Sequence, residues 1–117
     1  MNEMQCIKQF NYPVKDLAQA KKLYSTLLGT QPYIESPYYV GFRIGDQEIG
    51  LDPNAGKLGI TGPVPFFQVA DIKNTLQTLV DAGARVLQQP KDVGGGLLVA
   101  YIQDAEGNST GLLQPPH

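Results

Sequence analysis

The sequence is poor in two residues on which much covalent and catalytic chemistry depends. It has one cysteine, Cys6, and one histidine, His117, among 117 residues. A single cysteine excludes a disulfide bond within the chain and fits a reducing compartment, and we expect Cys6 to be a small buried hydrophobic residue near a strand. Because the one histidine is the last residue, we expect neither a Ser-His-Asp triad nor a Cys-His pair.

An excess of basic residues is also lacking. The sequence contains nine Lys and Arg and eleven Asp and Glu residues, which gives a net charge of −2. Among the basic residues only Lys21 and Lys22 are adjacent. Nucleic-acid binding requires a basic face, so we expect no nucleic-acid partner. The first ten residues contain no long apolar run of the kind found in signal peptides or membrane spans. We therefore expect a cytoplasmic protein that does not bind membranes.

Two stretches of the chain share one helical pattern. In the first, Asp16 is placed to cap a helix, Gln19 follows it as in a capping box, and Gly29 ends it. Between them, apolar residues recur at the spacing of one helical face. In the second stretch Asp71 and Gly83 take the same places. The two capping aspartates are 55 residues apart, which indicates an internal duplication.

Segments with strand character surround both helices in the same order. One precedes each helix, at residues 7–14 and 64–69, and three follow each: 32–35, 37–45 and 47–52, then 85–90, 96–104 and 109–113. This order predicts an α+β fold in one domain, residues 1–117. It consists of two βαβββ modules, at about residues 5–52 and 63–115, with a Gly- and Pro-rich linker at about 53–62. We expect an eight-stranded, incompletely closed barrel-like sheet with the helices outside and a cleft on its inner face.

Two motifs and the repeat carry a resemblance to a known family. They are VKDLAQAKKLYSTLLG at residues 14–29 and DAEGNSTGLLQP at residues 104–115, the latter with Ala105 where the family usually has proline. The chain resembles the vicinal oxygen chelate superfamily, which includes glyoxalase I, extradiol dioxygenases and bleomycin-resistance proteins. The resemblance implies the fold and a homodimer. It does not define the function, because this superfamily supports several chemistries.

The enzymes of this superfamily hold a divalent metal with one side chain from each of four strands. By spacing from the motifs, these positions fall on Gln9, Gly50, Val64 and Gly111. Glutamine is an accepted ligand at the first position, but the other three residues have no donor side chain. Glu48 and Asp52 would flank Gly50 in an unbulged strand, which leaves a rebuilt metal site open. We expect the family's metal centre to be absent and no cofactor to be bound.

Glycines within strands usually lie where a ligand or a bulky neighbour approaches closely. Gly50 and Gly111 would therefore either widen the cleft for a ligand or be covered by a large side chain. The candidates for such a side chain are Tyr39, Phe42 and Phe66. The glycines at residues 94–96 are open to two interpretations in the same way, as a mobile lid or as a wide turn.

Strand alternation directs a mixed set of side chains to the inner face. We predict that a ligand contacts Gln9, Asn11, Glu48, Gly50, Val64, Phe66, Gln68 and Gly111. Amides, an aromatic ring and a carboxylate suit an aromatic or amphipathic small organic molecule. The pattern does not give the directions of Tyr39, Arg43 and Tyr101, so Arg43 is interpreted either as an anion anchor or as an exposed partner of Glu48 or Asp46.

Three functions follow from these residues and the resemblance. The first is a metal-free binding protein of the bleomycin-resistance type, with a small organic molecule as its partner and no catalytic residues. The alternative is a divalent-metal-dependent lyase, isomerase or dioxygenase of the glyoxalase kind, with Gln9 and further acids as ligands. The third is an interaction module whose inner face packs against a partner chain. The ligand itself does not follow from the sequence.

Overall fold

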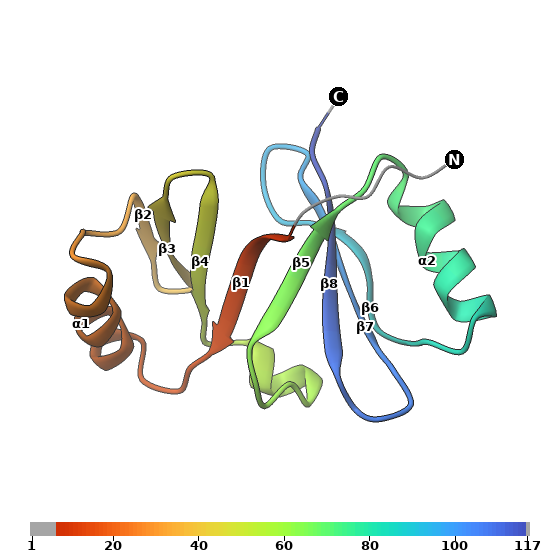
Figure 1. Cartoon of the computed structure of the whole chain (residues 1–117), viewed down its shortest axis with the longest axis horizontal. Helices are drawn as coiled ribbons and strands as arrows, with labels where there is room; N and C mark the ends of the chain where they lie inside the picture. Colours follow the sequence, from red (N-terminus) through yellow and green to blue (C-terminus); the bar gives the residue numbers. More distant parts are fainter. Residues whose placement is uncertain (1–6, 117) are drawn as a thin grey trace. The chain divides into compact units, whose positions relative to one another are not determined.

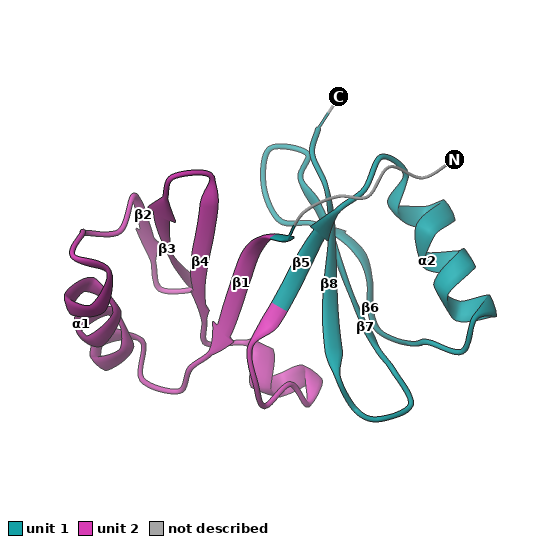
Figure 2. Ribbon diagram, viewed as in Figure 1, with its two compact units in different colours: residues 1–7, 65–117 teal, residues 8–64 magenta. Residues whose placement is uncertain are grey.

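The computed structural model describes residues 7–116 (Figure 1), so the expectations for Cys6 and His117 lie outside the described residues. The chain divides into two compact units, residues 8–64 and residues 65–117 together with 1–7 (Figure 2). Below, residues 7–63 are called the first module and residues 64–116 the second, so that Ile7 and Val64 are counted with the strands to which they belong. Within residues 7–116, no helix is long and apolar enough to cross a membrane.

The first module has the predicted order βαβββ. Strand β1 (Ile7–Pro13) and helix α1 (Leu17–Leu28) are followed by β2 (Ile34–Ser36), β3 (Tyr39–Ile44) and β4 (Gln47–Asp52). The strands lie in the order β2-β3-β4-β1, with β1 and β4 parallel and the other pairs antiparallel. The predicted linker contains a short 3-10 helix, η1 (Ala55–Leu58), which the sequence pattern did not indicate.

The second module repeats this order with β5 (Val64–Gln68), α2 (Ile72–Asp81), β6 (Arg85–Asp92), β7 (Leu98–Gln103) and β8 (Ser109–Gln114). Its strands lie in the order β5-β8-β7-β6, again with one parallel pair, β5 and β8. The predicted α+β class and both βαβββ modules are confirmed. Strand β6 continues past Pro90, where we expected it to end. A proline is tolerated there because the register of the β6–β7 pair shifts between Gln88 and Lys91.

Both helices begin at the predicted caps. The Asp16 carboxylate accepts a hydrogen bond from the Gln19 N–H at 3.0 Å, and Asp71 accepts one from the Asn74 N–H at 3.1 Å. Positive φ angles, which favour glycine, follow both helices at Gly29 and Gly83. The two halves of the chain therefore fold with the same local rules.

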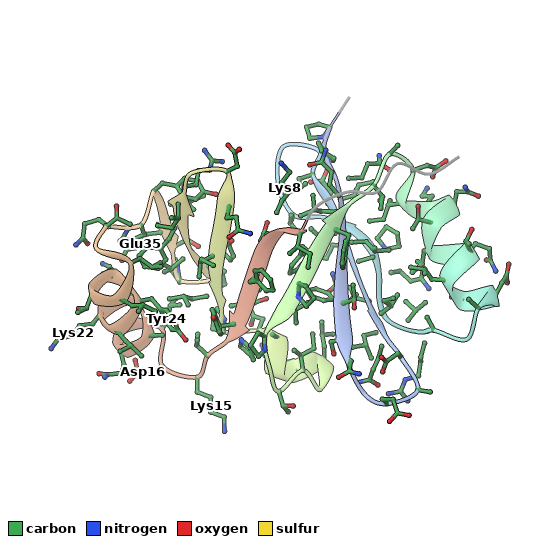
Figure 3. The ribbon with its side chains drawn as sticks, in the orientation of Figure 1. Lys8, Lys15, Asp16, Lys22, Tyr24 and Glu35 are labelled. Carbon is green, nitrogen blue, oxygen red and sulfur yellow. The ribbon has the colours of Figure 1, made fainter. Side chains whose placement is uncertain are left out.

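In the first module, the core lies between α1 and one face of the strands. Val40, Phe42 and Leu51 are buried there against the apolar face of the helix. Tyr24 points from α1 toward the strands (Figure 3). Its ring stacks on that of Tyr12, with the ring centroids 4.9 Å apart. This core fixes which face of the strands is covered by the helix.

The second module has a separate core of the same kind. Ile72 and Leu76 of α2 pack on Ala100, Ile102 and Leu112. In both modules the alternate residues of each strand therefore face away from the helix. This opposite side is called the helix-free face. In the first module it carries Gln9, Asn11, Tyr39, Gly41, Arg43, Glu48 and Gly50, and in the second Phe66, Val99, Tyr101, Gly111 and Leu113.

Candidate functional site

The helix-free face of the first module is rich in polar side chains. Glu48 on β4 lies between Gln9 on β1 and Arg43 on β3, and Gly50 lies beside Asn11. Four of the predicted site residues thus share this face, as the alternation of side chains along a strand predicts: Gln9, Asn11, Glu48 and Gly50. Arg43, whose direction the sequence left open, lies on the same side.

Hydrogen bonds connect five side chains on this face, here called the Tyr39 network: Gln9, Asn11, Tyr33, Tyr39 and Glu48. The Gln9 amide nitrogen donates to Asn11 Oδ1 at 2.9 Å and to the Tyr39 hydroxyl at 3.3 Å. The Tyr39 hydroxyl donates to one oxygen of Glu48, and the Tyr33 hydroxyl donates to the other at 2.6 Å. Both carboxylate oxygens of Glu48 are therefore used as acceptors. The sequence analysis assigned no role to Tyr33 and considered Tyr39 only as a space-filling residue.

The ring of Tyr39 covers Gly50. A Cβ atom at Gly50 would lie 2.6 Å from Tyr39 Cε1, and closer still to the Tyr39 hydroxyl and to Asn11 Oδ1. Gly50 is therefore covered by a large side chain, as one of the two interpretations had it, and it does not widen a cleft. Phe42, the other candidate in this module, is buried in the core on the helix side.

The pKa of Tyr33, a member of this network, is clearly shifted. Burial and its hydrogen bond to Glu48 raise the pKa of Tyr33 to about 12, and Arg43 acts in the opposite direction. The guanidinium carbon of Arg43 lies 4.2 Å from the Tyr33 ring centroid, a cation–π contact. Tyr33 therefore remains a neutral hydrogen-bond donor at ordinary pH.

The helix-free face of the second module is apolar instead. The Phe66 ring covers Gly111, where an added Cβ would lie 2.7 Å from Phe66 Cζ and closer to two other ring atoms. Phe66 also meets Tyr101 edge to face, with ring centroids 5.4 Å apart. The sequence left the direction of Tyr101 open. Tyr101 faces the same side as Phe66. Gly111 is covered by an aromatic ring, as Gly50 is in the first module.

The two remaining predicted site residues lie on β5. Val64 is fully buried, at 0% exposure. Gln68 is partly buried at the other end of the strand, where it pairs with Leu113 of β8. Alternation along β5 predicts that Phe66 and Phe67 point to opposite faces of the sheet. In the structure Phe66 lies on the helix-free face and Phe67 packs against the α2 core.

The side chains at the four family metal positions do not fit a divalent metal. Gln9 is hydrogen-bonded within the Tyr39 network, Gly50 and Gly111 are covered by rings, and Val64 is apolar and buried. Asp52, considered as a substitute ligand, accepts the Asn54 N–H at 2.8 Å. Among the described residues, no three His, Cys, Asp or Glu side chains form a group that could hold a metal ion.

Two further features lie in the second module. The segment at residues 94–96 is a hydrogen-bonded turn, in which the Asp92 carboxylate accepts the Gly94 N–H at 2.8 Å and the Val93 N–H donates to the Leu97 carbonyl at 2.9 Å. A depression of about 340 Å³ adjoins α2 and β6, and the sequence analysis did not predict it. It is lined by Lys73, Leu76, Gln77, Val80, Val86, Gln89 and Pro90.

The fold agrees with a comparison of the sequence with protein families. The chain belongs to the glyoxalase/bleomycin resistance protein/dioxygenase superfamily, whose sequence model matches residues 6–112. No functionally curated protein matches the sequence significantly.

Solved structures of similar fold cover at least 91% of the chain. They include an NAD-dependent benzaldehyde dehydrogenase from Legionella pneumophila, with 21% identity, a TM-score of 0.72, and coverage of 91% of this chain and 96% of that one. The hypothetical protein BH1468 from Bacillus halodurans C-125 has 15% identity, a TM-score of 0.76, and coverage of 98% and 97%. A methylmalonyl-CoA epimerase from Mycobacterium tuberculosis has 18% identity, a TM-score of 0.73, and coverage of 100% and 94%. At such identities the likeness establishes the fold alone.

Proposed function

We propose that this protein binds a small aromatic or amphipathic organic molecule on its helix-free faces without the help of a metal ion. One observation carries the proposal. The Tyr39 phenol covers Gly50, the position at which the family's enzymes have a metal-binding carboxylate, and its hydroxyl joins a set of amide and carboxylate groups. Affinity in such a site comes from hydrogen bonds and ring contacts.

The chemistry of the two faces supports this class of ligand. The first module offers hydroxyl, amide and carboxylate groups, which orient a polar substituent. The second offers the aromatic pair Phe66 and Tyr101, which favours a ring or an apolar chain. Each face, taken by itself, therefore offers contacts of a kind that such a molecule uses.

The arrangement of Glu48 favours binding over catalysis. Each of its oxygens accepts a hydrogen bond from a tyrosine, so the carboxylate is held in place by donors of the protein itself. A general base must lie within hydrogen-bond reach of the proton that it removes. The rival function, a metal-dependent lyase, isomerase or dioxygenase, would require metal ligands that these positions do not supply.

Metal analysis separates the two functions. Protein purified without chelator is analysed for metals and then titrated with Ni²⁺, Zn²⁺ and Mn²⁺ by calorimetry. We expect no stoichiometric binding and no change of the melting temperature on adding chelator. Tight binding of one metal ion per chain would overturn the proposal and favour the enzyme.

A thermal-shift screen of aromatic metabolites and antibiotics tests binding itself. We expect at least one compound to raise the melting temperature, and Tyr39→Phe to reduce that rise because the network loses a donor to Glu48. Tyr38→Phe is the matched control, since Tyr38 is 72% exposed in the turn before β3. Absence of any shift, together with a copurifying protein, would favour the interaction module.

We also propose that the chain forms a homodimer, as the family resemblance implies. Light scattering coupled to size-exclusion chromatography measures the mass of the particle directly. A monomer at micromolar concentration would refute this part of the proposal and leave the binding function standing.

A further inference from the structure

Arg43 is held in a defined orientation on an exposed surface. It lies on the helix-free face of β3, and its guanidinium group stacks on Tyr33 at 4.2 Å from the ring centroid. A guanidinium carries five N–H donors along its planar edges, and here one of these edges also contacts the Tyr33 side chain through a hydrogen bond. Those edges have the geometry that binds a carboxylate with two parallel hydrogen bonds.

Glu48, the acidic residue opposite Arg43 on the neighbouring strand, forms no ion pair with Arg43 among the described residues. Glu48 is the cross-strand neighbour of Arg43, and such opposite charges usually pair. Here the Glu48 oxygens accept the hydroxyl groups of Tyr33 and Tyr39 instead. Among the described residues, the ion pair that forms in this module joins Lys21 and Glu35, and Arg43 takes part in none.

An apolar surface adjoins Arg43. Tyr33 and Ile34 are 46% and 47% exposed. Both pack across Gly41, where an added Cβ would lie 3.1 Å from Tyr33 Cε1 and 3.0 Å from Ile34 Cγ2. Because Gly41 and Arg43 are two residues apart on β3, they lie on the same face. A fixed cation and exposed apolar side chains are therefore side by side.

We propose that Arg43, Tyr33 and Ile34 form an anchoring site for an amphipathic organic acid, with the carboxylate on Arg43 and the apolar part on Tyr33 and Ile34. The inference rests on the proposed function and adds the charge of the ligand to it. The net charge of the chain is −2. The net negative charge of the protein would by itself attract cationic ligands. A preference for anions must therefore come from the local arrangement around Arg43.

Three probes of similar shape test the charge preference: phenylacetate, phenylacetamide and phenethylamine, which are anionic, neutral and cationic. Their dissociation constants are measured by NMR titration or calorimetry. We expect phenylacetate to bind most tightly, and its binding to weaken with added salt. In Arg43→Gln, phenylacetate should bind about tenfold more weakly, the loss expected for one charge-assisted contact, while phenylacetamide should bind as before.

Two further variants sharpen the result. Arg43→Lys keeps the charge but loses the planar fork, so its affinity for phenylacetate should fall between those of the wild type and Arg43→Gln. Lys22→Gln removes an exposed cation that points away from the strands (Figure 3) and should change nothing.

Other results overturn the inference. Equal affinity of the wild type for the three probes, or unchanged phenylacetate binding in Arg43→Gln, would refute the anion site and leave the binding function intact. Binding of none of the three at millimolar concentration would also refute it. The metal titration and the ligand screen then decide the proposed function separately.

Discussion

The ring of Tyr39 lies across Gly50 and occupies the space that a side chain at position 50 would need. By the resemblance to the superfamily, position 50 is where its enzymes would carry a metal-binding carboxylate, and this chain has a glycine there. Here the carboxylate is two residues earlier, at Glu48, and it accepts the Tyr39 hydroxyl. Together the two residues place a neutral hydroxyl beside the Glu48 carboxylate and leave no room for a side chain at position 50.

This relationship predicts that Gly50→Ala destabilises the protein. The new methyl group would lie 2.6 Å from Tyr39 Cε1 and would displace the ring. Overpacking of this kind costs about 1–3 kcal/mol of unfolding free energy. Urea unfolding followed by circular dichroism measures the loss.

Gly56→Ala is the matched control, because a Cβ at Gly56 meets nothing within 4 Å and its φ is not in the left-handed region. We expect it to be neutral or slightly stabilising. The cost of Gly50→Ala should shrink in a Tyr39→Ala background, since the clashing ring is gone. Equal stability of Gly50→Ala and the wild type would contradict the position of Tyr39.

The second module makes a parallel prediction for Gly111→Ala. Its Cβ would lie 2.7 Å from Phe66 Cζ, and Phe66 in turn meets Tyr101 edge to face. The ring has little room to move, so we again expect a loss of about 1–3 kcal/mol. The same urea experiment in a Phe66→Leu background tests the cause. A loss that persists undiminished there would show that Phe66 is not the residue in the way.

Strand alternation was enough to predict one part of the candidate site. Gln9, Asn11, Glu48 and Gly50 share a face because β1 and β4 keep their register over these residues. The period of two in an unbulged strand then fixes the direction of every side chain. Their contact with a ligand remains a prediction.

The tyrosines of the network could not be placed in the same way. Tyr33 precedes β2, and Tyr39 is the first residue of β3. The predicted strand at residues 37–45 has no regular alternation of polar and apolar residues that would show which way Tyr39 points. A signal existed in the glycines, since Gly41 and Gly50 are paired on adjacent strands. Two glycines side by side leave a space for a large neighbouring group, and here the Tyr39 ring fills it.

The duplicated caps predict equal losses from equivalent substitutions. Asp16→Ala and Asp71→Ala each remove a side-chain acceptor from an N–H of the first helical turn. Each should lower the unfolding free energy by about 1 kcal/mol. Asn at either position keeps the acceptor and should restore most of the loss in the same urea experiment. Equal losses in the Asn and Ala variants would indicate that the caps act through their charge alone.

The raised pKa of Tyr33 predicts a pH dependence of stability on the alkaline side. The group ionises near its ordinary value of 10.0 in the unfolded chain but at about 12 in the folded one. Between these values the unfolded state has lost the proton and the folded state has kept it, so stability falls as pH rises. Below pH 10.0 this contribution is fully present. Tyr33→Phe should lessen the alkaline fall, measured as the unfolding free energy against pH. In a titration of tyrosinate absorbance, the variant should lack a late-ionising tyrosine of the wild type. Loss of an early-ionising one instead would contradict the burial and the Glu48 hydrogen bond that raise this pKa.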